Sequence, residues 1–440
     1  MSLCRIALAC DWIDPLSVLC GLSDSDGVAG LIAGAGDSQA HGGRWSYIGC
    51  EPQVVEVWDR SDDLFAPLED AAWQGMPVIG LASYDAGARA ATGARPSVWP
   101  DLILAQYPSL LIFDHVNRMV VAQGVGVDER EASDLAQQAM SWLAKAKDVP
   151  APSAPANTFD EDMSAADYAQ AVAEVVDRIG AGELFQANIA RGWAGTLASG
   201  REPFEVFLRL SQRRGAAYGA YVRWGDLALV SNSPELFVKL DAETRRMETR
   251  PIKGTRPRGA DARADTALAL ELQNSTKDRA ENLMIVDLMR NDLARVAEAG
   301  SVSVEALWAL EVHPTVHHLT STVSGRLRSG LGAADVLSAT FPPGSISGAP
   351  KHQAMKRIAG LEPPRGAWCG SLFGVDLQQR GDLTSSVLIR TASFRRTGQT
   401  WAWRALAGAG ITADSQPMEE AAETEAKFAA LRMALSSPDN

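Results

Sequence analysis

Cysteine is scarce in this sequence, and its spacing excludes the sites that cysteines most often build. The chain has 5 cysteines among its 440 residues, and no two of them form a C-x-x-C pair. An odd number without that spacing predicts neither a disulfide framework nor a zinc site. The five are Cys4, Cys10, Cys20, Cys50 and Cys369.

Long apolar runs are also missing. No stretch approaches the roughly 18 uncharged apolar residues that a membrane-spanning helix requires. The N-terminal MSLCRIALACDWIDPLSVLCGL is fairly apolar, but Asp11 and Asp14 interrupt it and only Arg5 precedes them. A signal peptide needs an unbroken apolar core and a small-residue cleavage site. We therefore expect no membrane association and a cytoplasmic location.

Positive charge is in deficit. The chain has 41 Lys and Arg residues against 54 Asp and Glu residues, a formal net charge of −13. Nucleic-acid binding requires a net basic surface that neutralises phosphates, so we expect no nucleic-acid partner. A small anionic substrate stays compatible with this balance, because a local basic site can lie in an acidic protein.

Internal repeats of 20 to 50 residues, the signature of solenoids and propellers, are absent. The clearest seam is the linker VPAPSAPANT at 149–158, rich in proline and alanine. It divides the chain into an N-terminal α/β region at 1–148 and a C-terminal region at 159–440. In the first region, two apolar strands flank a turn at 114–117, and a helix is expected over 129–147.

The C-terminal region mixes helices with hairpins. A capping box of Ser164 and Asp167 predicts a helix over 164–182. Hairpins are predicted in AYGAYVRWGDLALVS, turning at Gly225-Asp226, and between ELFVKL and METRPIKGT, turning at 241–246. Further helices are expected at 261–272, 276–296, 348–358 and 418–435. This mixture favours an antiparallel α+β core over a doubly wound parallel sheet.

Two stretches combine lysine with glycine and proline. RPIKGTRPRG at 250–259 holds four cations, with Lys253 between Ile252 and Gly254. These cations can bind an anion or be merely solvated. FPPGSISGAPK ends at Lys351 where a helix is expected to begin, and helix starts bind anions. It lacks the spacing of the phosphate loop, which argues against a nucleotide site, and a structural turn is the alternative.

Two predicted helices carry pairs of carboxylates one turn apart. Asp278 and Glu281 are three residues apart, as are Glu420 and Glu423. Such residues share a helix face, and carboxylate oxygens suit a hard cation such as Mg²⁺. A solvated helix face is the alternative for each pair, and Glu423 with Lys427 also has the spacing of a helix-stabilising ion pair.

The last candidates lie at the ends of predicted strands. Arg390 ends an alternating strand, and a short Gly-Ala-Gly run at 408–410 lies at the end of another strand and exposes backbone donors there. Arginine forks and glycine N–H groups are good carboxylate receptors. His318 stands beside a strand in VHHLTSTVSG. Taken alone, each of these features is equally compatible with an ordinary turn, strand end or polar core residue.

Taken together, the stretches resemble the chorismate-utilising enzymes. PIKGTRPRG, KDRAENLMIVDLMRND, VHHLTSTVSG, FPPGSISGAPK, AWCGS, IRTA and GAGITADSQP stand in the order and approximate spacing of that family. The resemblance is dense over about residues 160–435 and fainter over 1–148. It implies an α+β fold in which two packed antiparallel sheets are surrounded by helices, with chorismate bound in a cleft of the C-terminal catalytic region.

The same resemblance implies roles for individual residues. It implies Mg²⁺ held by Glu281 and Glu423, with Asp278 and Glu420 in support through water. His318 resembles the active-site histidine of the family. Contacts to the substrate are implied for Arg390, Gly408, Ala409, Gly410, Thr255 and Lys427.

Lys253 indicates the branch of the family. Anthranilate synthases usually carry alanine there and add ammonia at C2 of chorismate. Aminodeoxychorismate synthases carry PIKGT, as here, and their lysine is thought to attack C2 before ammonia replaces the C4 hydroxyl. Glu235, 18 residues earlier in SPELF, resembles the catalytic acid of that branch. The resemblance therefore implies a component I of aminodeoxychorismate synthase, in p-aminobenzoate and folate biosynthesis.

Two alternatives stay open: a component I of anthranilate synthase, in tryptophan biosynthesis, and a non-catalytic protein that binds chorismate or docks a partner. The intact Glu235, Lys253, Glu281 and Glu423 argue against the second, although a fold alone never guarantees activity.

An attacking lysine must be neutral, whereas a free lysine has a pKa of roughly 10.4. Arg250, Arg256, Arg258 and Mg²⁺ would each lower the pKa of Lys253. In a strand, however, these arginines alternate to the opposite face. We therefore expect burial and the metal to lower it more than the arginines do.

The ammonia must come from elsewhere. A class I glutaminase needs a nucleophilic cysteine at a glycine-flanked elbow, and none of the five cysteines has that setting. Cys369, in AWCGS, falls within the synthase motifs. We therefore expect a separate glutaminase subunit that docks on this chain and supplies ammonia.

Overall fold

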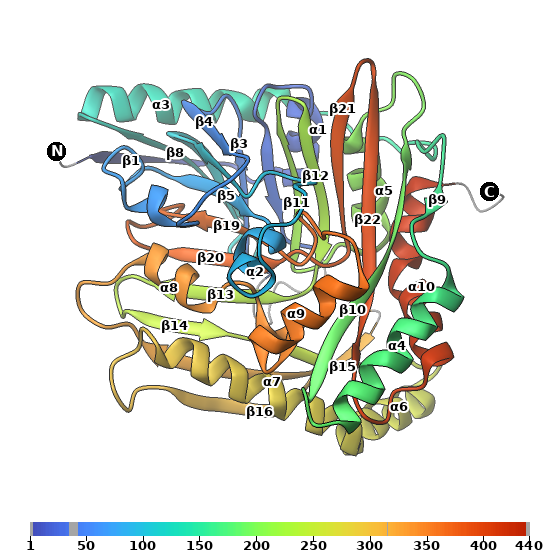
Figure 1. Ribbon diagram of the computed structural model, residues 1–440. Helices are drawn as coiled ribbons and strands as arrows, with labels where there is room; N and C mark the ends of the chain where they lie inside the picture. The colour runs from blue at the N-terminus through green and yellow to red at the C-terminus, as the bar shows by residue number, and fades with distance from the viewer. Residues whose placement is uncertain (1–2, 35–42, 315, 437–440) are drawn as a thin grey trace.

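The computed structural model describes residues 3–34, 43–314 and 316–436, and it consists of two large antiparallel sheets with helices around them (Figure 1). The fold class predicted from the sequence is confirmed. Within the described residues, no helix has both the length and the apolar character needed to span a membrane.

The larger sheet has twelve strands among the described residues. Its order is β1 (Cys4–Cys10), β8 (Met119–Gly126), β7 (Ser109–Asp114), β3 (Trp45–Gly49), β2 (Ala29–Ile32), β11 (Tyr218–Trp224), β12 (Leu227–Ser233), β21 (Thr391–Thr397), β22 (Thr400–Ile411), β10 (Gln186–Thr196) and β18 (Gly348–Ala349), with β9 (Asp160–Glu161) paired to β10.

The smaller sheet has ten strands among the described residues. Its order is β15 (Ile252–Pro257), β17 (Val316–Arg326), β14 (Arg246–Thr249), β13 (Leu236–Asp241), β20 (Leu383–Val387), β19 (Ser371–Val375), β5 (Val78–Ala82), β6 (Leu102–Gln106) and β4 (Val54–Trp58), with β16 (Ser303–Val312) paired to β17.

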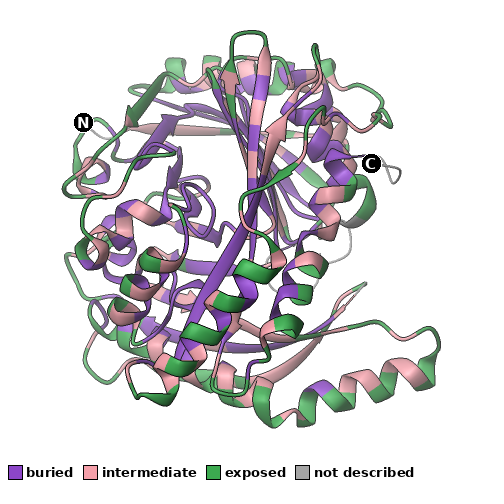
Figure 2. Cartoon of the chain, turned by 45° about the vertical axis from the view of Figure 1, so that its right-hand side comes forward, coloured by how far each residue is buried: buried purple, intermediate pink, exposed green. Residues whose placement is uncertain are grey.

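Helices cover the outer faces of both sheets. They are α1 (Pro15–Leu22), α2 (Tyr84–Thr92), α3 (Glu129–Ser141), α4 (Ala165–Gly180), α5 (Pro203–Arg214), α6 (Ala262–Asn274), α7 (Thr276–Ala294), α8 (Ala333–Thr340), α9 (Lys351–Leu361) and α10 (Pro417–Leu435), with short 3-10 turns η1 (Ala66–Glu69), η2 (Trp142–Lys145) and η3 (Gly344–Ile346). Figure 2 shows the strands as mainly buried and the outward faces of the helices as exposed.

Strands from both sequence regions share both sheets. In the larger sheet β2 pairs with β11, and in the smaller sheet β5 pairs with β19. One apolar core cluster contains Leu81 of β5 and Ile103 of β6 together with Leu229 of β12. The linker at 149–158 is therefore not a division between the two sheets.

Several local predictions are confirmed. Ser164 caps α4 by accepting a hydrogen bond from the Asp167 N–H at 3.1 Å, and Tyr168, Val172 and Val175 on one face of that helix pack into a core cluster. The hairpin of β11 and β12 turns at Gly225-Asp226, since Trp224 pairs with Leu227.

Three local predictions need correction. The predicted helix over 129–147 ends as α3 at Ser141 and continues only as η2. The hairpin predicted between ELFVKL and METRPIKGT does form, between β13 and β14. Its second strand is interrupted, however: METRPIKGT forms two strands, β14 and β15, because Pro251 has no N–H to continue the ladder. The predicted helix over 348–358 begins at Lys351 instead. Gly348, with φ 135°, pairs in β18 with β10, and this backbone conformation cannot continue a helix.

Candidate functional site

Lys253 reaches from the smaller sheet to the larger one. It lies on β15, and its Nζ donates a hydrogen bond to Oδ1 of Asn188 on β10, at 3.3 Å. The same Nζ lies close to β22, because a Cβ placed on Gly410 would be 3.4 Å from it. The lysine therefore ends between the two sheets, next to the first residues of β10 and the last residues of β22.

Burial lowers the pKa of Lys253 below its usual value. The charges around the amine partly oppose each other: Glu281 raises the pKa, Lys427 lowers it, and Glu235 and Glu423 raise it. A lowered pKa increases the fraction of neutral amine at neutral pH. Burial thus favours the form of Lys253 that can act as a nucleophile.

The arginines flanking Lys253 are paired with acids and are not among the groups with the largest effects on its pKa. Arg256 contacts Asp278 at 3.1 Å and Glu271 at 3.0 Å. Arg258 pairs with Asp265 at 2.7 Å, and Arg250 pairs with Glu311. As expected, burial outweighs these arginines, and the cation that assists it is Lys427.

Glu235 provides a buried carboxyl group near the lysine. It lies in the short connection between β12 and β13 and is 4% exposed. Burial raises its pKa to about 7, against the opposing effects of Ser345, Lys253 and the Ile252 backbone. A carboxyl group with such a pKa can hold a proton near neutral pH and donate it, as a general acid must.

The four predicted metal-binding carboxylates lie on two neighbouring helices. Asp278 and Glu281 are in the first turns of α7, and Glu420 and Glu423 are in the first turns of α10. Lys277 on α7 contacts Glu420 at 3.8 Å and thereby links the two helices. The structure thus brings together the two carboxylate pairs, although their sequence positions lie far apart.

Glu281 is the carboxylate best suited to a cation. Among the described residues it has no hydrogen-bond or ion-pair partner, and burial raises its pKa. The other three have partners: Glu423 pairs with Lys427 at 2.6 Å, Glu420 accepts from Ser415 at 2.7 Å, and Asp278 pairs with Arg256. In the described part of the chain, no three His, Cys, Asp or Glu residues are grouped to hold a metal ion. Mg²⁺ often takes only one or two protein carboxylates besides water and substrate, so these residues fit it.

His318 and Thr255 lie on adjacent strands. They are paired residues of β17 and β15, and Thr255 Oγ1 is 2.9 Å from His318 Nδ1. Burial lowers the pKa of His318 to about 3, and Arg390 adds to this effect. His318 is therefore a neutral imidazole at physiological pH, beside a hydroxyl group and a cation.

Arg390 does not end a strand, which corrects the prediction. β20 ends at Val387, and Arg390 occupies a bend with φ 52° before β21. Its charge still lowers the pKa of His318. The bend thus brings the arginine near the histidine.

Gly408, Ala409 and Gly410 are among the last residues of β22, which ends at Ile411, so they lie at a strand end as predicted. They pair with Ala190, Ile189 and Asn188 of β10. β21 pairs with β22 only as far as Ala405, so no other described strand pairs with this part of β22 on its other edge. The Gly408 carbonyl accepts a hydrogen bond from Lys427 at 2.9 Å, whereas Ala409 is buried in the core.

Lys351, the cation of FPPGSISGAPK, has internal partners. Its Nζ contacts Asp292 at 2.5 Å and donates to the Thr340 carbonyl at 2.9 Å. It therefore holds α9 against α7 and α8. These internal contacts favour the structural turn over the anion site, the two interpretations given for this stretch.

Two polar residues of the site were missed from the sequence. Gln186 and Asn188 point from the same face of β10 toward Gly410, since a Cβ there would be 2.3 Å from Gln186 Nε2 and 3.1 Å from Asn188 Oδ1. Gln186 is fully buried, and neither of its amide atoms has a hydrogen-bond partner among the described residues. Their signal was two amides at alternate positions of an apolar strand, in FQANIA.

A separate cavity of about 630 Å³ lies elsewhere between the sheets. Residues of β2, β3 and β11 line one side, including Trp45 and Tyr218, and residues of β13 and β20 line the other. None of the residues predicted to bind substrate or metal lines it.

The chain resembles known proteins along most of its length. The chorismate binding enzyme family matches residues 31–433. Aminodeoxychorismate synthase component 1 of Escherichia coli (strain K12) is 39% identical over 378 residues, which cover 84% of this chain and 79% of that protein. Anthranilate synthase component 1 of Saccharolobus solfataricus is 39% identical over 278 residues, which cover 63% of this chain and 64% of that protein.

The solved structure of anthranilate synthase component I from Streptococcus pneumoniae has the same fold, with a TM-score of 0.72 and 27% sequence identity. The match covers 90% of this chain and 93% of that one. With the family match spanning both sequence regions, the chain belongs to the chorismate binding enzyme family.

Proposed function

We propose that this chain is an aminodeoxychorismate synthase component 1, which converts chorismate and ammonia to 4-amino-4-deoxychorismate and water. One observation carries the proposal: the amine of Lys253, whose pKa is lowered, lies between the two sheets, where its pKa is also affected by Glu235, a buried carboxyl group with a pKa of about 7. The relatives named aminodeoxychorismate synthase support the same activity.

In the first step, the neutral amine of Lys253 forms a bond to C2 of chorismate. The ring double bonds shift and the C4–O bond breaks. Glu235 gives its proton to the departing oxygen, which leaves as water, and then accepts a proton from the new C2–nitrogen. Hydroxide is a poor leaving group, so a proton donor is needed, and a carboxyl group with pKa near 7 is suited to that task.

In the second step, ammonia forms a bond to C4, the double bonds shift back, and the C2–nitrogen bond to Lys253 breaks. The departing lysine nitrogen takes the proton from Glu235, and the new ammonium group at C4 returns one. The enzyme is thereby restored. Dividing one difficult displacement into two easier ones is the usual advantage of a covalent intermediate.

Mg²⁺ fits the acidic helices α7 and α10. Glu281 and Glu423 would hold the ion, with Asp278 and Glu420 in support through water; when bound, it would supply positive charge to the ring carboxylate of chorismate. Charge neutralisation is needed there, because the substrate is a dianion and the site itself contains several carboxylates.

The remaining site residues would bind the substrate carboxylates. Arg390 offers a planar fork of donors. Thr255 and neutral His318 offer hydrogen-bonding groups beside it. Gly408 and Gly410 lie on the edge of β22 that no described strand covers beyond Ala405, where backbone N–H groups can donate to an anion. Lys427 lies beside Gly408.

Ammonia would come from a partner. The name component 1 of the related enzymes implies a second subunit, and we propose that a glutaminase supplies ammonia to this chain. Binding of a purified glutaminase subunit, followed by glutamine-dependent product formation, tests that proposal.

Incubation of the purified chain with chorismate, Mg²⁺ and ammonium tests the activity itself, with the product identified by mass and fluorescence. We expect 4-amino-4-deoxychorismate, and we expect Lys253→Ala to lower its formation by at least about a hundredfold, because the nucleophile is lost. Anthranilate as the only product would instead indicate an anthranilate synthase. No turnover with any nitrogen source would indicate a non-catalytic chorismate-binding protein.

A further inference from the structure

Asn188 is the only hydrogen-bond partner of the Lys253 amine among the described residues. Its Oδ1 accepts from Nζ at 3.3 Å across 65 residues of sequence. Asn188 is 8% exposed, and its Nδ2 has no partner among the described residues. The side chain is therefore directed at the lysine and makes no other hydrogen bond with the described part of the chain.

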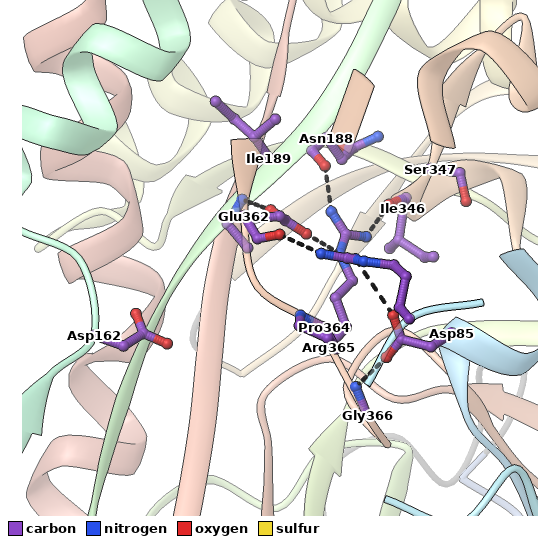
Figure 3. A network of polar contacts seen from close by, with 12 residues as sticks. Asp85, Asp162, Asn188, Ile189, Ile346, Ser347, Glu362, Pro364, Arg365 and Gly366 are labelled. Atoms are coloured by element: carbon purple, nitrogen blue, oxygen red, sulfur yellow. Dashed lines mark hydrogen bonds and ion pairs between the residues drawn. The ribbon is translucent and has the colours of Figure 1, made fainter. Parts of the chain in front are cut away.

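Hydrogen bonds from outside β10 fix the backbone at and next to Asn188. Arg365 donates to the Asn188 carbonyl at 2.5 Å, and Glu362 accepts from the Ala190 N–H at 2.7 Å (Figure 3). Arg365 and Glu362 pair with each other at 2.5 Å, and both are buried. The Asn188 N–H donates to the Ser347 carbonyl at 2.9 Å.

These contacts can give the Lys253 amine the fixed position that its flexible side chain does not provide. A lysine side chain is a flexible four-carbon stem that can adopt many rotamers, so its amine has no fixed position of its own. A side chain on a backbone fixed by a buried ion pair can hold that amine in one place. Misplacement of a reacting group by about 1 Å can cost about a hundredfold in rate.

We propose that Asn188 is a positioning residue, which holds the Lys253 amine beside Gly410 in the place where the reaction needs its nucleophile. The proposal rests on the proposed function for its kinetic effect, but the contact itself can be tested without substrate. Asn188→Leu keeps the shape of the side chain and removes the acceptor. Asn188→Ser, too short to reach Nζ, serves if the leucine variant does not fold.

The matched control is Gln123→Leu. Gln123 is a buried amide of the same sheet, on β8, and its side chain makes one hydrogen bond among the described residues, to the Leu377 carbonyl at 2.9 Å. It lies in the strand next to β1, at the other end of the sheet order from β10. Its loss therefore reports the cost of removing a buried amide without touching the site.

Two measurements are made on each variant: kcat and KM with chorismate and ammonium, and the rate at which an amine-acylating reagent labels Lys253 in the free protein, followed by mass spectrometry. We expect Asn188→Leu to lower kcat about ten- to a hundredfold, with the KM for chorismate changed less than about threefold, because the contact is to the lysine. Labelling should be several-fold faster, since the released amine can meet the reagent from more directions. Gln123→Leu should change neither.

An unchanged kcat in both Asn188 variants would overturn the proposal. A parallel fall in kcat and in labelling would overturn it too, because that result indicates a collapsed site. If the wild-type protein makes no 4-amino-4-deoxychorismate, the proposed function fails by itself. Labelling then decides about Asn188: faster labelling supports the positioning contact, and a wild-type rate contradicts it.

Discussion

Lys253 and Gly410 lie against each other across the space between the two sheets. A Cβ on Gly410 would be 3.4 Å from the lysine Nζ and 2.3 Å from Gln186 Nε2. Glycine at this position is thus what leaves room for the amine on the face of the larger sheet.

Gly410→Ala should impair the enzyme without unfolding it. The new methyl group must displace the Gln186 amide and crowd the lysine, so we expect kcat/KM to fall by about a hundredfold. Steady-state kinetics with ammonium measures the effect. Gly180→Ala is the control, because a Cβ at the end of α4 meets no atom within 4 Å; equal activity of the two variants would contradict the packing argument.

Glu235→Gln should lose the proton donor. Removing a general acid typically costs about 10²- to 10⁴-fold in rate. Because burial raises the pKa of Glu235 to about 7, the wild-type step that needs its proton should slow as pH rises through that value. A pH profile of kcat measures this fall, and the profile of the glutamine variant should not show it. A variant with the wild-type profile would exclude Glu235 as the acid.

The same substitution should stabilise the fold at alkaline pH. The pKa of Glu235 is higher in the folded protein than in the unfolded chain, so the unfolded state binds fewer protons between the two values. The wild type therefore loses stability as pH rises from about 4.5 to about 7, by roughly 2–3 kcal/mol. Thermal unfolding should show that Glu235→Gln is more stable than the wild type at pH 8 but not at pH 5. Glu56→Gln, on an exposed part of β4, should show no such difference.

Glu281→Gln should weaken Mg²⁺ binding. Glu281 is the one of the four predicted carboxylates without a hydrogen-bond or ion-pair partner among the described residues, and an amide is a poorer ligand for a hard cation. We expect the Mg²⁺ concentration for half-maximal activity to rise at least about tenfold, and calorimetric titration with Mg²⁺ to show the same shift. Glu419→Gln, at an exposed position of α10 next to Glu420, is the control.

Arg365→Met should destabilise the protein strongly. It leaves Glu362 buried without its partner, and removing one member of a buried ion pair costs about 3–5 kcal/mol. It also removes the donor to the Asn188 carbonyl. Urea unfolding measures the loss. Arg201→Met, which breaks the half-exposed pair with Glu205, should cost at most about 1 kcal/mol.

Local patterns predicted the helices of the site well. The pairs Asp278/Glu281 and Glu420/Glu423 share a helix face because of the 3.6-residue period, which needs no tertiary information. Strand ends were predicted less well. Arg390 was predicted to end a strand, whereas it lies in a left-handed bend after the end of β20. Where a strand ends depends on its neighbours, and those come from distant parts of the chain.

The sequence by itself determined the residue types of the site. The ordered motifs indicated the family, and Lys253 and Glu235 were identified from motif positions alone. Tertiary structure decided which groups meet. Asn188 and Lys253 are 65 residues apart and belong to different sheets. The pKa values of Lys253 and Glu235 depend mainly on burial. Burial and contacts across sheets arise only when the packed fold removes these groups from water.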